Sequence, residues 1–286
     1  MSLAQLITPL QLANRPGQPD RLILDCRFAL DDLDYGQRSY AQGHIPGAVF
    51  ADLEQDLSGA IVKGLTGRHP LPNPQVLVER LRAWGLNNDS EVILYDDNKG
   101  NGAFAARAWW LLVWLGKRDN VYLLDGGFKA WNEAGLPVNT APPERSPGTF
   151  TGQADNSLVV SAEQLELILG DPELTLLDAR ALARFKGEQE PIDPVAGHIP
   201  GAQCAAFTDN LDRDGRFLPA EQLRARFAAL LGERSAEGLV AYCGSGVTAC
   251  HNLFALSLAG YPLAPLYAGS WSEWITDPER PVATGE

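Results

Sequence analysis

The residues best suited to chemistry in this sequence are a cysteine and the short loop that follows it. Cys243 ends the apolar run Leu239–Tyr242 and is followed by Gly-Ser-Gly-Val-Thr, residues 244–248, and then by a helical pattern from Ala249. Backbone N–H groups at a helix N-terminus have no intrahelical partner, and with the helix dipole they favour negative charge. Gly244 and Gly246 allow the backbone to curl around the sulfur. The pattern therefore favours a reactive thiolate at Cys243 over an inert core cysteine.

A thiolate facing N–H donors suits two reactions: phosphate-ester cleavage through a phosphocysteine and sulfur transfer through a persulfide. A cysteine phosphatase needs an arginine after five intervening residues to bind the phosphoryl oxygens bidentately. That position is Ala249. A persulfide needs only the N–H donors, a permissive backbone and shelter from stray thiols. The loop therefore favours sulfur transfer.

The other cysteines suggest no metal site, since Cys26, Cys204, Cys243 and Cys250 follow no metal-ligand spacing. Neither a metal nor a cofactor is expected. Cys26 and Cys204 read as core residues. Cys250 lies two helical turns after Cys243, which fits either helix packing or a redox partnership with the loop thiol.

Composition limits the class of protein. The chain has 286 residues, enough for about two domains, and a formal net charge of −13. This charge argues against nucleic acid or an anionic membrane surface as the main partner. The longest apolar run, residues 108–115, is too short to cross a bilayer. The N-terminus lacks the basic region and cleavage site of a signal peptide, so we expect a reduced, cytoplasmic protein.

The elements that must position the loop occur twice along the chain. The hexapeptide Gly-His-Ile-Pro-Gly-Ala stands at residues 43–48 and again at residues 197–202. Helix-start patterns with a capping Thr8 or Ser161 precede it, each with glutamine three residues later. Apolar strands that end in Asp25 and Asp178 follow those helices. A repeat of this length indicates a duplicated domain.

Within each copy, short apolar strands alternate with helical patterns, which predicts an α/β fold with a mostly parallel sheet flanked by helices. Residues 141–156 are rich in proline, glycine and polar residues and read as a linker. We predict a first domain over residues 1–140 and a second over residues 157–286.

The two copies differ at the chemical loop. Aligning Tyr95 with Tyr242 places Asp96 opposite Cys243, so the second copy is the predicted catalytic domain. The first copy is then a partner that walls the cleft, since ligands of α/β proteins bind at the carboxyl ends of parallel strands and between domains. His44 and His198 occur in both hexapeptides, although only one copy carries the cysteine, so we interpret them as parts of the scaffold.

The loop from Cys243 to Ala249, Cys-Gly-Ser-Gly-Val-Thr-Ala, resembles the active-site loop of the rhodanese-like sulfurtransferases, above all the 3-mercaptopyruvate branch. The duplication extends this resemblance over essentially the whole chain. It implies two tandem rhodanese-like domains with a non-catalytic first copy. It also implies that the loop residues Gly244, Gly246, Val247 and Thr248 surround the substrate.

The resemblance implies roles for further residues. Arg184 matches the arginine that binds the substrate carboxylate in the family. Glu54 and His69 match an acidic residue and a histidine that join the loop serine, here Ser245, in a proton relay. His69 would then titrate near neutral pH.

One departure from the family weakens the assignment of 3-mercaptopyruvate as the donor. A second carboxylate-binding arginine is expected just before the second hexapeptide, but residues 190–196 read Glu-Pro-Ile-Asp-Pro-Val-Ala.

The sequence therefore predicts a sulfurtransferase that moves a sulfane sulfur from 3-mercaptopyruvate to cyanide or thiols, thioredoxin among them. No Lys or Arg lies between Cys243 and His251, which disfavours a dianionic donor. The missing second arginine keeps thiosulfate open as the donor. A sulfane-sulfur carrier module without turnover would use Cys243 equally well.

Overall fold

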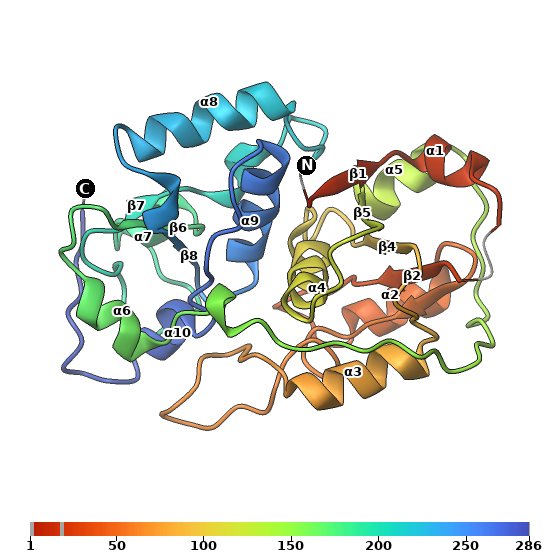
Figure 1. The fold of residues 1–286 in the computed structure, drawn as a ribbon, viewed down its shortest axis with the longest axis horizontal. Coiled ribbons are helices and arrows are strands. Elements are labelled where there is room, and N and C mark those ends of the chain that lie inside the picture. Colours follow the sequence, from red (N-terminus) through yellow and green to blue (C-terminus); the bar gives the residue numbers. More distant parts are fainter. Residues whose placement is uncertain (1–2, 18–19, 286) are drawn as a thin grey trace.

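Two α/β halves follow one another along the chain and lie side by side in the computed structural model, which describes residues 3–17 and 20–285 (Figure 1). The first half is built on a five-stranded sheet in the order β1-β5-β4-β2-β3, and the second on a three-stranded sheet in the order β7-β6-β8. All neighbouring strands in both sheets are parallel. The strands are β1 (Gln5–Ile7), β2 (Leu22–Asp25), β3 (Ala48–Phe50), β4 (Val92–Tyr95), β5 (Val121–Leu124), β6 (Thr175–Asp178), β7 (Gln203–Cys204) and β8 (Leu239–Tyr242). The predicted parallel α/β architecture is confirmed.

The second sheet has the strand order of the first, but the two positions beyond β8 are occupied by isolated β-bridges instead of strands. Leu266 forms parallel bridges with Val159 and with Ala241 of β8. This places Val159 and Leu266 where β1 and β5 lie beside β4 in the first half. The duplication read from the sequence is therefore also a duplication of strand order.

Helices flank both sheets, and their starts follow the capping rules. The side chains of Thr8 and Ser161 each accept a hydrogen bond from the backbone N–H of the third helical residue, a glutamine. The side chain of that glutamine accepts a hydrogen bond from the backbone N–H of Thr8 or Ser161, so both predicted capping boxes are confirmed. The α-helices are α1 (Pro9–Asn14), α2 (Tyr35–Gln42), α3 (Pro74–Ala83), α4 (Ala103–Trp114), α5 (Gly127–Glu133), α6 (Ala162–Ile168), α7 (Leu182–Phe185), α8 (Ala220–Leu231), α9 (Thr248–Leu258) and α10 (Ser270–Trp274). Short 3₁₀ turns lie at η1 (Asn156–Leu158), η2 (Phe207–Asn210) and η3 (Ala236–Gly238).

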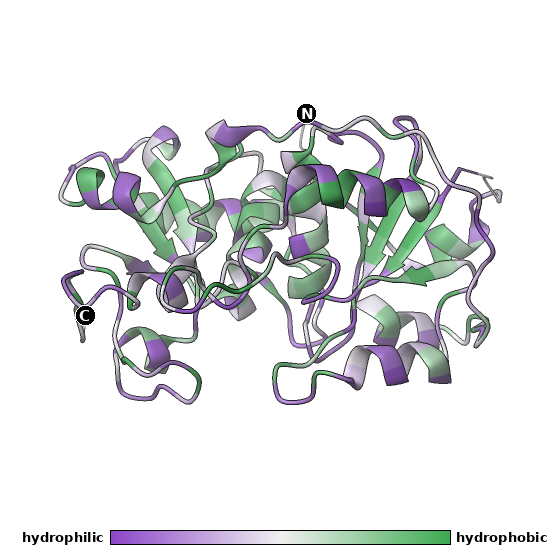
Figure 2. Ribbon diagram, turned by 90° about the horizontal axis from the view of Figure 1, so that it is seen from below, coloured by the Kyte–Doolittle hydropathy of each residue, from purple (hydrophilic) through white to green (hydrophobic). Residues whose placement is uncertain are grey.

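The two halves meet along α4 and α9, which lie next to each other in Figure 1. Every residue of α4 is buried, as expected for a helix whose residues other than Arg107 are all apolar. Trp109 of α4 packs edge-on against Phe254 of α9, with ring centroids 5.0 Å apart. Hydropathy colouring shows the strands as mainly apolar and the outer helices as mixed (Figure 2). In the described part of the chain, no helix is long and apolar enough to cross a membrane.

The repeated hexapeptides are structural, as predicted. The Nδ1 atoms of His44 and His198 lie 2.9 and 2.8 Å from the carbonyl oxygens of Tyr40 and Phe185. Each imidazole also stacks on the ring of that same aromatic residue. Both histidines therefore connect the turn of the hexapeptide to the helix that precedes it.

Candidate active site

The cysteine loop joins the end of β8 to the start of α9. Cys243 is 1% exposed, and its Sγ accepts a hydrogen bond from the Gly246 N–H at 3.1 Å. Gly246 has φ +76°, and a Cβ there would lie 2.4 Å from the Ala268 carbonyl oxygen. Only glycine fits this position, so the predicted backbone curl around the sulfur is present.

A cavity of about 250 Å³ opens above this sulfur and is lined by both halves of the chain. From the second half come the predicted residues Cys243, Gly244, Ser245, Val247, Thr248 and Arg184. From the first half come His69, Arg68, Leu53, Lys99, Gly100 and Phe104, among others. Gly246 lies behind the sulfur rather than in the cavity wall. The site is therefore an interdomain cleft at the carboxyl end of a parallel strand.

His69 and Ser245 meet in this cleft, as the sequence predicts. His69 Nδ1 lies 2.8 Å from Ser245 Oγ. Burial, together with the positive charges of Arg107 and Arg68, lowers the pKa of His69 to about 3. The expectation that His69 titrates near neutral pH is wrong, because its imidazole is neutral throughout the physiological range.

Glu54 does not join this pair. Its side chain is exposed and does not line the cavity. Asp52 Oδ1 accepts hydrogen bonds from the N–H groups of Glu54 and Gln55 at 2.8 and 2.9 Å, which builds a tight turn there. Among the described residues, no hydrogen bond or ion pair connects the Glu54 carboxylate to His69. Matching by sequence position could not show which way this turn points the side chain.

Two guanidinium groups converge on Gly244. A Cβ built there would lie 2.9 Å from Arg68 Nη2 and 3.6 Å from Arg184 Nη1. Arg184 donates to Glu190 at 2.7 Å and to Asp193 at 3.0 Å. Arg68 forms an ion pair with Asp193 as well. The cleft thus holds two paired arginines, one from each half of the chain.

Arg68 is the residue that sequence reasoning missed. The segment in which the family carries its second arginine supplies Asp193 instead, and that carboxylate binds Arg68 from the other domain. The sequence offered one indication of this role: Arg68 directly precedes His69, which was already a candidate site residue.

Cys250 lies beneath the loop and is fully buried. Its thiol donates to the Gly246 carbonyl oxygen at 3.2 Å. Burial raises the pKa of Cys250 to about 12, so at neutral pH it is a protonated thiol with no route to solvent. This environment favours packing over the redox partnership.

We therefore expect Cys250→Ser to retain sulfur transfer within about two- to threefold, because a hydroxyl can make the same bond to Gly246. Steady-state turnover with thermal unfolding as a fold control checks this. Loss of turnover in a folded variant would restore a chemical role for Cys250.

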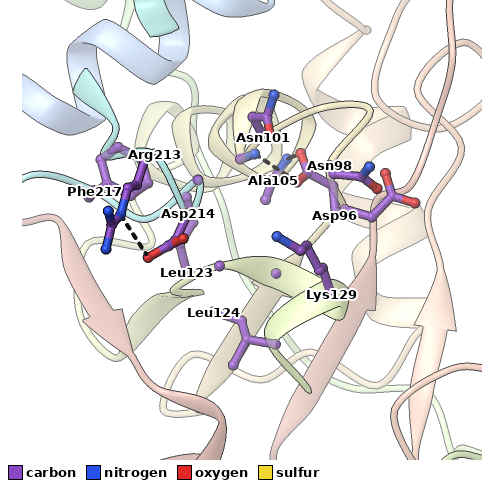
Figure 3. A pocket seen from close by; sticks show the side chains of 15 residues that line it. Asp96, Asn98, Asn101, Ala105, Leu123, Leu124, Lys129, Arg213, Asp214 and Phe217 are labelled. Atoms are coloured by element: carbon purple, nitrogen blue, oxygen red, sulfur yellow. Dashed lines mark hydrogen bonds and ion pairs between the residues drawn. The ribbon is translucent and has the colours of Figure 1, made fainter. Parts of the chain in front are cut away.

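The corresponding loop of the first half is closed by a carboxylate. Asp96, which the alignment places opposite Cys243, accepts hydrogen bonds from the N–H groups of Gly102, Phe104 and Ala105 at 2.7, 2.9 and 3.2 Å. Burial raises its pKa to about 7. Beside it lies a smaller cavity of about 120 Å³, whose labelled residues include Asn98, Lys129 and Arg213 (Figure 3). These N–H groups are bound to Asp96, and residues 96–102 contain no thiol, so this loop cannot form a persulfide.

Two buried histidines make the fold sensitive to acid. Burial lowers the pKa of both His69 and His251 to about 3, against 6.5 in an unfolded chain. Between these values the unfolded chain binds protons that the folded chain excludes. The contribution of the two histidines to the free energy of unfolding is therefore fully present above pH 6.5. It decreases as the pH drops from 6.5 towards 3, by up to about 1.4 kcal/mol per pH unit for each histidine.

Urea unfolding at about pH 7 and pH 5 measures this loss. His251→Gln should show a smaller difference between the two pH values than the parent chain. An equal difference in the two proteins would contradict this assignment for His251.

Comparison with known proteins agrees with this geometry. The family model for the rhodanese-like domain matches residues 8–134 and 161–277, so the chain belongs to the rhodanese-like family. It is 68% identical over 286 residues to a probable 3-mercaptopyruvate sulfurtransferase of Pseudomonas aeruginosa, with 100% of both chains covered. It is 43% identical over 290 residues to a putative thiosulfate sulfurtransferase of Mycobacterium tuberculosis, covering 98% of this chain and 97% of that one. Among solved structures, the 3-mercaptopyruvate sulfotransferase SseA of Escherichia coli superposes with a TM-score of 0.80 at 34% identity, covering 94% of this chain and 100% of that one.

Proposed function

We propose that the protein is a sulfurtransferase that moves a sulfane sulfur from 3-mercaptopyruvate to cyanide or a thiol through a persulfide on Cys243. The observation that carries this proposal is the interdomain cleft, where one sulfur atom, a serine–histidine pair and two guanidinium groups line a single cavity. Residues 157–286 form the catalytic domain in this scheme. Residues 1–140 supply the opposite wall, and residues 141–156 connect the two.

The proposed cycle has two displacements. The Cys243 thiolate attacks the sulfur of mercaptopyruvate, an S–S bond forms, and the C–S bond breaks with its electron pair on carbon. The enolate takes the proton of the donor thiol and leaves as pyruvate, and Cys243 becomes a persulfide anion. Cyanide or a thiolate then attacks the outer sulfur, the S–S bond breaks, and the Cys243 thiolate returns. The charge on Cys243 is the same before and after each step.

The serine–histidine pair provides the proton path in this scheme. The Ser245 hydroxyl takes up the proton of the donor thiol as it gives its own proton to the enolate carbon, and the neutral His69 imidazole, 2.8 Å from Ser245 Oγ, orients this hydroxyl. Ser245 lies in the cavity wall next to Cys243 and Gly244, where the enolate carbon would be released. We assign no role in the relay to Glu54.

The two arginines support a carboxylate-bearing donor. The mercaptopyruvate carboxylate would replace Asp193 between Arg184 and Arg68, where a guanidinium fork binds a carboxylate well. Asp193 and Glu190 neutralise both arginines in the resting site, so a single-charged donor fits this charge balance better than dianionic thiosulfate. The convergence of two cations on Gly244 is the observation that favours thiosulfate as the second candidate.

Comparison of the two donors tests the proposal. With cyanide as acceptor, we expect a higher kcat/KM for mercaptopyruvate than for thiosulfate. A higher value for thiosulfate would transfer the assignment to the second candidate. Release of only one equivalent of pyruvate per protein would identify a carrier module. Replacing cyanide by a small dithiol or by reduced thioredoxin then ranks the acceptors expected in a reducing cytoplasm.

A further inference from the structure

Arg107 is a buried arginine of α4 that belongs to the first half of the chain but reaches under the cysteine loop. It is 0% exposed. Its Nη1 donates to the Gly246 carbonyl oxygen at 3.0 Å, and its Nη2 donates to the carbonyl oxygens of His69, Pro70 and Leu57 at 3.1, 3.3 and 3.4 Å. Its Nε has no hydrogen-bond partner.

Within residues 3–17 and 20–285, no carboxylate pairs with this guanidinium. An arginine remains charged at all physiological pH values, and a buried charge without a counter-ion costs several kcal/mol. The other arginines of the cleft are compensated: Arg180 by Asp178, Arg184 by Glu190 and Arg68 by Asp193. Arg107 therefore leaves one positive charge unbalanced at the base of the site.

Arg107 and Cys243 contact opposite sides of the same peptide residue, Gly246. The Gly246 N–H donates to Cys243 Sγ, while the Gly246 carbonyl oxygen accepts from Arg107 and from the Cys250 thiol. Burial lowers the pKa of Arg107, and its interactions with the neighbouring sulfur atoms of Cys250 and Cys243 oppose that shift. Burial keeps Cys250 protonated, so Cys243, which lines the cavity, is the sulfur of the loop that reacts in the proposed cycle.

We propose that Arg107 is a positioning residue for sulfur transfer: it is the resident counter-ion of the Cys243 thiolate and of the persulfide anion, and it fixes Gly246 and His69 around them. This inference rests on the proposed function and gives the first domain a part in the chemistry beyond that of a wall. One fixed cation serves the whole cycle, because the charge on Cys243 does not change between its two covalent states.

Alkylation of Cys243 by iodoacetamide as a function of pH tests this proposal without any sulfur donor. Five charged or titratable side chains line the cavity with Cys243: Arg68, His69, Lys99, Arg180 and Arg184. Arg107 of α4 and Cys250 of α9 contact the loop from below, at the Gly246 carbonyl oxygen. The rate constant for Cys243 is followed on its own peptide by mass spectrometry. Arg107→Gln removes the charge but keeps hydrogen-bond donors, Arg107→Met removes both, and Arg107→Lys keeps the charge.

We expect the midpoint of the alkylation profile to move upward by about one pH unit or more in Arg107→Gln and Arg107→Met, and by less in Arg107→Lys. Arg226→Met is the matched control, since Arg226 is a half-buried arginine that bonds Asn210 and the Ala206 carbonyl oxygen away from the loop. Its profile should equal that of the parent chain. A folded Arg107→Gln or Arg107→Met variant with the parent midpoint would overturn the proposal.

Failure of the proposed function is distinguishable from failure of this inference. An absence of turnover with every donor in the parent chain would refute sulfur transfer, while the alkylation profiles would still report whether Arg107 balances Cys243.

Discussion

Replacement of Cys243 by serine is expected to reduce sulfur transfer by at least about three orders of magnitude while leaving the fold intact. An alcohol is a far weaker nucleophile than a thiolate, and Ser–O–S bonds do not replace the persulfide in the cycle. The serine hydroxyl is smaller than the thiol and can still accept the bond from the Gly246 N–H. Thiocyanate formation and the mass of the protein after incubation with donor measure the loss of turnover and of bound sulfur.

Cys204→Ser is the matched control for this variant. Cys204 belongs to the same half of the chain, is half-buried at β7 and lies outside the cleft. It should keep parental turnover and gain one sulfur atom as the parent does. Turnover retained by Cys243→Ser would remove Cys243 from the mechanism.

The sequence predicted the fold well because both copies carry local signals that agree with each other. Strands β2, β4 and β8 read as short apolar runs because each is buried on both faces. The capping boxes at Thr8 and Ser161 are visible as four-residue patterns. The weakened outer strands of the second sheet, around Val159 and Leu266, were not visible, since a single bridge leaves no run of alternating or apolar residues.

The site was predictable where a contact lies within one loop, and less so where it depends on distant elements. Gly246 and Cys243 interact over three residues, whereas His69 reaches Ser245 from 176 residues away. That pairing came from the family resemblance, and the resemblance misplaced Glu54. The role of Arg107 was not predictable, because a single arginine in an otherwise apolar helix does not show from the sequence which groups it contacts.

The loop sequence alone also misjudged the charge of the cleft. It lacks Lys and Arg, yet Arg68 and Arg184 approach Gly244 from two other elements. The contribution of this charge to donor choice is therefore tested by removing Arg68 or Arg184.

Replacement of Arg184 by alanine is expected to lower kcat/KM for mercaptopyruvate by about 10- to 100-fold, mainly through KM. A charge-assisted bond to a desolvated carboxylate contributes about 1.5–3 kcal/mol, and the variant also leaves Glu190 and Asp193 facing the anionic donor. Arg68→Ala should act in the same direction but less strongly, because its side chain is 28% exposed against 17% for Arg184. Steady-state kinetics at saturating cyanide provide both constants.

The matched control is Arg38→Ala, which removes an exposed arginine that pairs with Asp32 on the surface of the first half. Such a pair contributes little, so this variant should keep the parental KM. Arg184→Lys separates charge from geometry: a lysine keeps the positive charge but lacks the planar fork, and we expect it to recover only part of the loss. If Arg184→Ala and Arg68→Ala both keep the parental kcat/KM, the two guanidiniums serve only to hold Asp193 and Glu190. The donor carboxylate would then have to be bound by the loop N–H groups.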